Sequence, residues 1–432
     1  MPLKQNKVKS LRRFLLLLVL FSTLSGALRK WFIPSEAVGN LVLFLQLMFP
    51  YLIILFIPVF KALNRKFSAV LIIYTLALII LALNPLNHTY FHGLLGILLH
   101  LGFWFLIFIY LSTPEDVPIQ TLSKAFILLF VFELILGVFQ YSLPKNHIIN
   151  QYAVDEVTNI ATVGSAVRVS GTFSYISGYS AFLIFGGLVL WGLARLKTTS
   201  WVILLLGGGG FLASLMNGSR SIIVIFSILF FYSFLSIPNY KIKVNLFLIM
   251  IVVAFLSIAF IGPSSLQFVE STVDNFMTRV ESNQASGEQS KRIFEPLSDL
   301  QKFLDQENTF LLNGLGLGST YQGANAIWGT SPYLAEVGYY EGELGRIFIE
   351  GGLILLFLKI FLFGVLFIDS NIPRSYLLPF LGLTFFYIPI VFNIYNLVFL
   401  FLGLAFVDKA YYLTSDRKNL RSDKQIKEHV KT

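Results

Sequence analysis

Long apolar runs recur along the chain and are separated by shorter polar segments. Each run has about 17–22 residues, which as a helix is long enough to cross the ~30 Å hydrocarbon core of a membrane. The runs are apolar on all sides, whereas the strands of a membrane barrel alternate apolar and polar residues. Since only helices and closed barrels satisfy their backbone in lipid, the pattern predicts an all-α, polytopic bundle of transmembrane helices.

Twelve runs are long enough to be spans of this bundle. They cover residues 11–28, 38–60, 67–83, 93–111, 122–143, 172–194, 200–216, 220–236, 244–262, 347–368, 375–390 and 392–408. The first nine spans thus occupy residues 1–261, the last three occupy 347–408, and a basic cytoplasmic tail follows at 409–432. The polar composition of this tail predicts that it is unstructured.

The longest polar segment, residues 262–346, is predicted to be a large extracytoplasmic loop. It holds nearly half of the chain's 23 acidic residues. A loop of this length in a compact protein is usually functional or disordered. Its aliphatic and aromatic residues argue against full disorder, so we expect short helices that cap the outer membrane face. A second long segment, 144–171, lies on the same predicted side.

Composition supports a membrane protein and narrows its chemistry. Charged residues make up 13% of the chain and hydrophobic residues 56%, against about 25% charged residues in soluble domains. The net charge of +9 comes from Lys and Arg near helix ends, and their excess in the short loops of one side places both termini in the cytoplasm. The chain has no Cys, and its five His have no metal-ligand spacing on one helix, so neither a metal nor a cofactor is expected.

Four arginines are predicted at the outer membrane face. Arg168 precedes the sixth span, Arg220 begins the eighth, and Arg279 and Arg292 lie in the large loop. A guanidinium group binds phosphate oxygens in bidentate fashion, so the four are candidates for a clamp on pyrophosphate or another anion. The alternative for each is an interfacial arginine whose stem lies in the membrane while its charge reaches water.

Acidic residues surround a fifth arginine where the large loop enters the tenth span. On a helix, Glu343, Arg346 and Glu350 would lie on one face, and Glu341 lies just before them. A carboxylate here could be a general base, or it could hold the arginine in place. Glu133, a single acid in the fifth span, could pair with an arginine or relay protons.

Two glycine-rich segments carry weaker signals. Residues 207–210 are not followed by the Lys and Ser or Thr of a phosphate-binding loop, so they predict close packing of helices. Residues 314–319, GLGLGS, lack the strand-to-helix context of a nucleotide site.

Several of these motifs occur in the order found in the bacterial O-antigen ligase/polymerase family, which the chain resembles over roughly residues 165–408. Arg168, Gly171 and Phe173 look like the family's Arg-x-x-Gly-x-Phe before a span. Ser219 and Arg220 are similar to its Ser-Arg-Gly stretch at a helix start.

The resemblance continues through the large loop and into the next helix. Arg292, followed by NGLGLG at 313–318, looks like the family's loop arginine and Gly-x-Gly-x-Gly. Glu350, followed by two glycines, resembles its Glu-x-Gly helix start. Ligases of the family carry His-Asn nine residues before this glutamate, whereas this chain has Glu341 there, which fits polymerase-like members better.

The resemblance implies a glycosyltransferase of the bacterial inner membrane that polymerises undecaprenyl-pyrophosphate-linked oligosaccharides into O-antigen or exopolysaccharide. The four arginines would bind the pyrophosphate, Glu341 or Glu343 would take the proton of the acceptor hydroxyl, and Arg346 and Glu350 would support them. One alternative is a ligase that transfers polymer to lipid A-core or to a protein; another, of a different class, is a polysaccharide transporter or flippase. The expected partners are the lipid-linked glycan, membrane lipids and, optionally, a chain-length regulator, but no nucleic acid.

Overall fold

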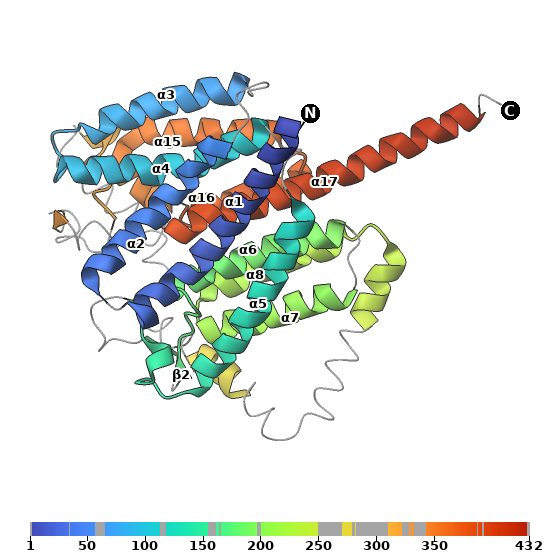
Figure 1. The fold of residues 1–432 in the computed structure, drawn as a ribbon, viewed down its shortest axis with the longest axis horizontal. Helices are drawn as coiled ribbons and strands as arrows, with labels where there is room; N and C mark the ends of the chain where they lie inside the picture. The colour runs from blue at the N-terminus through green and yellow to red at the C-terminus, as the bar shows by residue number, and fades with distance from the viewer. Residues whose placement is uncertain are drawn as a thin grey trace.

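The structure is a computed structural model that describes residues 2–33, 35–56, 65–112, 118–153, 161–163, 166–196, 200–248, 270–278, 281, 310–321, 328–329, 331, 343–386, 388–390 and 393–429. Within these ranges the chain is almost entirely helical, and its strands are limited to one hairpin of two-residue strands (Figure 1). The predicted all-α fold class is thereby confirmed.

The helices follow the apolar runs. They are α1 (Pro2–Ala27), η1 (Leu28–Phe32, a π-helix), α2 (Glu36–Met48), η2 (Phe49–Phe56), α3 (Arg65–Ala82), α4 (Tyr90–Ser112), α5 (Ile119–Ser142), η4 (Ile148–Asn150), α6 (Ile176–Arg195), α7 (Ser200–Asn217), α8 (Arg220–Ser236), α12 (Phe310–Asn313), α15 (Glu343–Asp369), α16 (Arg374–Phe386) and α17 (Ile394–His429), with β1 (Thr162–Val163) and β2 (Ala166–Val167) between α5 and α6.

The described chain contains eight helices long and apolar enough to cross a membrane, and α7 and α8 are shorter apolar helices. These features indicate a multi-pass membrane protein. The ninth predicted span, 244–262, and most of the predicted large loop, 262–346, lie outside the described residues. The total of twelve spans and the extent of the loop therefore stay predictions.

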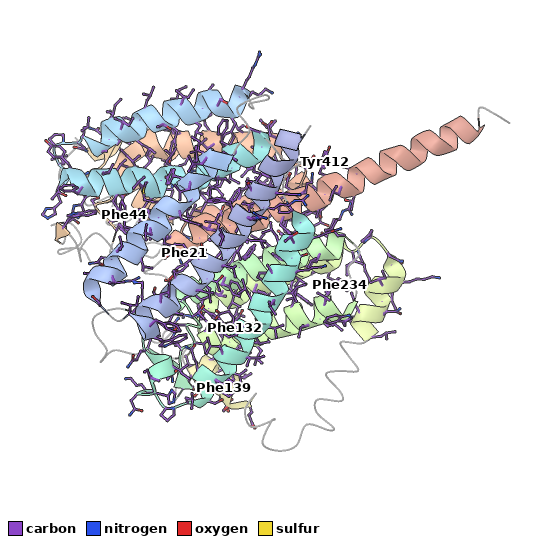
Figure 2. The ribbon with its side chains drawn as sticks, viewed as in Figure 1. Phe21, Phe44, Phe132, Phe139, Phe234 and Tyr412 are labelled. Carbon is purple, nitrogen blue, oxygen red and sulfur yellow. The ribbon has the colours of Figure 1, made fainter. Side chains whose placement is uncertain are left out.

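Helix α6 lies at the centre of the bundle and packs along α17, α7 and α8. In Figure 1, α3, α4 and α15 form a layer on one side of α17, and α5, α6, α7 and α8 lie on the other side. Rings of Phe182, Phe185 and Phe399 pack together between α6 and α17. By contrast, Phe44 and Phe139 are exposed on α2 and α5 (Figure 2), as expected of side chains that face lipid.

The non-helical segments described below lie at one end of the bundle, which we call the loop end, and their polar contacts extend from there into its interior. Here α1, α3, α5 and α7 end, while α4, α6, α8 and α17 begin. The N- and C-terminal ends of the chain both lie toward the opposite end (Figure 1). This arrangement agrees with an even number of crossings.

Glycines 207–210 of α7 were predicted to allow close packing of helices, and most of them do so. A Cβ on Gly210 would lie 2.1 Å from the ring of Phe226, and one on Gly207 would lie 2.4 Å from that of Phe230. Helices α7 and α8 thus approach more closely than larger residues would allow. Gly208 faces open space, with nothing within 4 Å.

Helix α15 is broken, which the uninterrupted apolar pattern did not predict. Gly352 has φ 58° and ψ −153°, which no helix interior adopts. Glu343 and Lys359 are nevertheless joined by a 2.8 Å ion pair, although 16 residues of straight helix would separate them by about 24 Å. The chain therefore reverses at Gly352, so that residues 343–351 fold back against the helix that follows.

The prediction of an unstructured tail is wrong, because α17 continues without a break to His429. The span that precedes the tail supplies a formed helix to extend, so the tail avoids the cost of nucleation. Beyond the bundle this extension projects away from the other helices (Figure 1).

Candidate functional site

Two non-helical segments fold inward at the loop end. The first, residues 168–175, connects the β-hairpin to α6, and the second, residues 314–320, we call the glycine loop. Irregular backbone at membrane depth is tolerated only where protein or water satisfies its polar groups. Both segments meet this requirement through buried side chains of the surrounding helices.

Three side chains cradle the first segment at residues 170–172. Gln140 of α5 accepts hydrogen bonds from the backbone N–H groups of Ser170 and Gly171. Lys30 donates to the Ser170 hydroxyl at 3.0 Å and to the Gly171 carbonyl at 2.7 Å. The turn thus has a donor or acceptor for each of these groups, and η1 and α5 are joined to it.

Glu133 completes this cradle. Its carboxylate accepts hydrogen bonds from the backbone N–H and the hydroxyl of Thr172, and it is 1% exposed. The sequence left open whether Glu133 pairs with an arginine or relays protons. Its contacts instead favour a structural role, because both interactions fix the position of Thr172.

We predict that Gln140→Leu lowers the free energy of unfolding by about 1–3 kcal/mol, since it leaves two buried N–H groups without an acceptor. Gln120→Leu is the matched control, because Gln120 lies exposed on the same helix and should have little effect. Thermal unfolding of the purified protein in detergent measures the difference. Equal melting temperatures for the two variants would contradict the prediction.

Two of the predicted arginines share one corner of the loop end. Arg168 donates through Nε to the carbonyl of Asn217, the last residue of α7, at 2.9 Å. Arg220 begins α8 three residues later, and its buried Nη1 has no hydrogen-bond partner among the described residues. Ser219 precedes the helix but does not cap it with its side chain. A cation at a helix N-terminus opposes the helix dipole, so this corner is strongly positive.

The hydroxyl of Tyr152 lies against the same corner and donates to the carbonyl of Arg168 at 2.9 Å. Burial raises the pKa of this hydroxyl, while the charge of Arg168 acts in the opposite direction. Tyr152 therefore stays protonated at neutral pH and can donate this bond.

A second corner gathers two further arginines around Tyr321. Arg29, on the π-helix, donates to the Ser174 hydroxyl at 3.2 Å, and Tyr395 of α17 donates to the same hydroxyl at 3.1 Å. Burial raises the pKa of the Tyr321 hydroxyl, and the charges of Arg29 and Arg346 lower it. Tyr321 also belongs to the same buried cluster as Ile394, the residue before Tyr395. The buried Nε of Arg29, like Nη1 of Arg220, has no partner among the described residues.

The two corners are connected by the segment 168–175, which begins with Arg168 and ends beside Ser174. Asn217 links them further, because its amide donates to the carbonyls of Val169 and Ile176. Cationic groups from η1, α8, α15 and the segment after the hairpin thus lie toward one end of the bundle. Such an arrangement suits an anion with several oxygen atoms.

Glu350, predicted as a supporting residue, anchors the glycine loop. Its carboxylate accepts hydrogen bonds from His100 Nε2 and Gly318 N, both at 2.8 Å, and from the backbone and hydroxyl of Thr320 at 3.0 and 2.6 Å. Glu350, His100 and Thr320 are all 0% exposed. The cost of a carboxylate at this depth is offset by these four hydrogen bonds, one of them to a histidine.

Glu343, predicted as a candidate general base, is 1% exposed and paired with Lys359, which is 2% exposed. Arg346 is also buried, at 7% exposed. The predicted helical face of Glu343, Arg346 and Glu350 therefore turns into the protein. The other candidate base, Glu341, and the loop arginines Arg279 and Arg292 lie outside the described residues.

Sequence reasoning missed several of these groups. In the sequence, Arg29 and Lys30 are simply two positive charges beside a span. In the structure they lie on a π-helix, and π-helical turns often occur at functional sites. His100 was considered only as a metal ligand, and its partner is 250 residues away. In the described part of the chain no group of three or more His, Asp or Glu side chains is placed to hold a metal ion.

The fold and the site define the chain as a multi-pass α-helical membrane protein with a cationic, partly re-entrant polar site at one end of its bundle. Comparison with protein-family models, curated proteins and solved structures gives no match.

Proposed function

We propose that the chain is a membrane glycosyltransferase that polymerises undecaprenyl-pyrophosphate-linked oligosaccharides into O-antigen or exopolysaccharide. The observation that carries the proposal is the pair of buried guanidinium nitrogens, Arg29 Nε and Arg220 Nη1, that have no partner among the described residues. Both lie at the loop end of the bundle. A buried charged donor without an acceptor is costly, and a bound pyrophosphate would supply the acceptors.

In the proposed reaction, the bond between the anomeric carbon of the donor glycan and its phosphate oxygen breaks. The lipid pyrophosphate leaves with the bonding electron pair, and Arg29, Arg168 and Arg220 stabilise the charge that develops on it. The oxygen of an acceptor sugar hydroxyl bonds to the anomeric carbon, and its proton passes to a carboxylate. Arg346 supports the site beside Tyr321, and Arg279 and Arg292 of the large loop would add further contacts.

Glu341 is the better candidate for this carboxylate. Glu343 is buried and paired with Lys359, so it would have to break an ion pair to accept a proton. This proposal places the loop end on the extracytoplasmic side of the bacterial inner membrane, with both termini in the cytoplasm. A ligase that delivers the polymer to lipid A-core or to a protein would use the same donor chemistry.

The test is elongation of a lipid-linked repeat unit by the purified protein in detergent. We expect Arg29→Ala and Arg220→Ala each to reduce elongation by about 100-fold or more, the usual effect of removing one charged group that stabilises a transition state. Arg65→Ala is the matched control, because Arg65 is exposed at the opposite end of the bundle. If both site variants elongate at the rate of the control, the pyrophosphate site is wrong.

One observation favours a second candidate, a transporter or flippase for lipid-linked sugars. Broken helices with re-entrant backbone often form the substrate sites of secondary transporters, and α15 is broken at Gly352. Elongation in detergent distinguishes the two classes, because no gradient or second compartment exists there. Movement of the lipid-linked sugar in proteoliposomes without any elongation would favour the transporter.

A further inference from the structure

The glycine loop is held by its backbone against the broken part of α15. Leu315 and Gly316 donate their N–H groups to the carbonyls of Ile349 and Glu350, at 2.7 and 3.2 Å. Helix carbonyls just before a break lack their usual partners, so the break at Gly352 makes these two oxygens available to the loop. The reversal of α15 thus creates the edge on which the loop lies.

The connection between α3 and α4, together with α4 itself, holds the other side of the loop. The amide of Asn84 donates to the Gly314 carbonyl and that of Asn87 to the Leu317 carbonyl, both at 3.0 Å. Gly96 of α4 packs directly against Leu317, because an added Cβ would lie 2.5 Å from it. The loop is therefore enclosed by α3, α4 and α15.

His100 is the side chain that joins α4 to the carboxylate of this assembly. Its Nε2 shares Glu350 Oε2 with the N–H of Gly318, and the histidine backbone carbonyl accepts a hydrogen bond from Tyr74. Glu350 Oε1 takes both bonds from Thr320. One oxygen is thus shared between α4 and the loop and the other binds the loop alone, so the orientation of the carboxylate sets the position of the loop.

The loop leads directly into the second arginine corner. Tyr321 follows Thr320 and donates its N–H to the Gly318 carbonyl at 3.1 Å. Tyr321 shares a buried cluster with Ile394 of α17, and the adjacent Tyr395 donates to the same Ser174 hydroxyl as Arg29. A shift of residues 318–320 would therefore move Tyr321 relative to Tyr395 and Arg29.

From this connection we propose that His100 is a positioning residue for the anion site. It orients the Glu350 carboxylate, which seats the glycine loop and thereby places Tyr321 at the corner that holds Arg29. This inference rests on the proposed function only where it concerns pyrophosphate. The link from His100 to the loop is tested separately.

The first measurement is thiol labelling at a single site. The chain has no cysteine, so an introduced cysteine is the one thiol that can react. Ser319 is 3% exposed and its hydroxyl has no hydrogen-bond partner among the described residues, so Ser319→Cys is a mild change that reports on the seating of the loop. We expect N-ethylmaleimide to label this thiol at least about tenfold faster when His100→Leu is added, because loss of the histidine bond increases local opening. His100→Gln keeps an N–H donor and should restore protection.

The second measurement separates positioning from packing. In the elongation assay, His100→Leu should raise the KM for the lipid-linked donor about tenfold, because the anion site is displaced. His100→Gln should return KM most of the way to that of the unsubstituted protein. A histidine that only packs would change protein yield but not KM. If His100→Leu fails to accumulate, Thr320→Val provides the same comparison, since it keeps the side-chain shape and removes one bond to Glu350.

Equal labelling of Ser319→Cys with and without His100→Leu would overturn the inference, and so would an unchanged KM. A different result would count against the proposed function instead. If the unsubstituted protein elongates nothing while labelling still depends on His100, the anchor is real and the glycosyltransferase proposal is wrong.

Discussion

Lys359→Met is expected to lower the free energy of unfolding by about 3–5 kcal/mol, because it removes one partner of a buried ion pair. Lys359 Nζ lies 2.8 Å from Glu343 Oε1, and both side chains are almost fully buried. Without the ammonium group, the buried carboxylate would lose its ion-pair partner in a poorly solvated position. Thermal or denaturant unfolding in detergent measures the loss, and Lys241→Met, at an exposed lysine, is the control.

The double variant Glu343→Leu/Lys359→Met should recover most of this stability, since replacing both partners of a buried pair by apolar residues is often neutral. Recovery would also demonstrate the reversal of α15, because the two residues could not interact across a straight helix. If the double variant is less stable than Lys359→Met alone, the pairing is wrong. Its elongation activity further separates the two candidate bases: activity would leave Glu341 in that role and exclude Glu343.

The break in α15 illustrates a limit of hydropathy. The sequence from Ile347 to Ile368 is apolar enough to predict one uninterrupted span, and the apolar pattern is the same whether a helix continues or folds back. Two adjacent glycines permit a reversal without requiring it. Tertiary packing determines that the helix reverses here, because α12 and the start of the glycine loop occupy the space beside Gly351 and Gly352.

The positions of the helices were easier to predict, because lipid imposes length and composition on each span separately. The start of α8 at Arg220 and its end at Ser236 match the predicted span. The sixth span was predicted to begin at residue 172, but α6 begins at Ile176. The difference arises because residues 170–175 are small or aromatic and uncharged, so the sequence pattern does not separate them from the span. In the structure Gln140, Lys30 and Glu133 hold their backbone in a turn.

The candidate site was predicted in part. Arg168 and Arg220 do lie together, and their common feature was visible in the sequence as an arginine at the boundary of a span. Arg29 has the same feature, but its contact with Ser174 joins residues 145 positions apart, which no local pattern reveals. The contact of His100 with Glu350 is of the same kind, because no local pattern connects α4 with α15.

Gly318→Ala is the second variant with a large expected effect, a loss of about 2–5 kcal/mol from backbone strain and overpacking together. Gly318 has φ 76°, a left-handed conformation that side chains with a Cβ disfavour. An added Cβ would lie 2.1 Å from the carbonyl oxygen of His92. That oxygen belongs to the backbone of α4, so it cannot move aside as a flexible side chain would.

The physical consequence should be concentrated at the glycine loop. Gly318 donates its N–H to Glu350, so displacing it breaks the anchor as well as the packing, and elongation should fall with stability. Gly364→Ala is the matched control, because Gly364 is helical and has nothing within 4 Å of an added Cβ, and alanine favours a helix over glycine. Unfolding and elongation of the two variants can be compared in the same detergent. If Gly318→Ala is as stable as Gly364→Ala, the loop is not seated against α4, and the positioning of Tyr321 by the glycine loop fails with it.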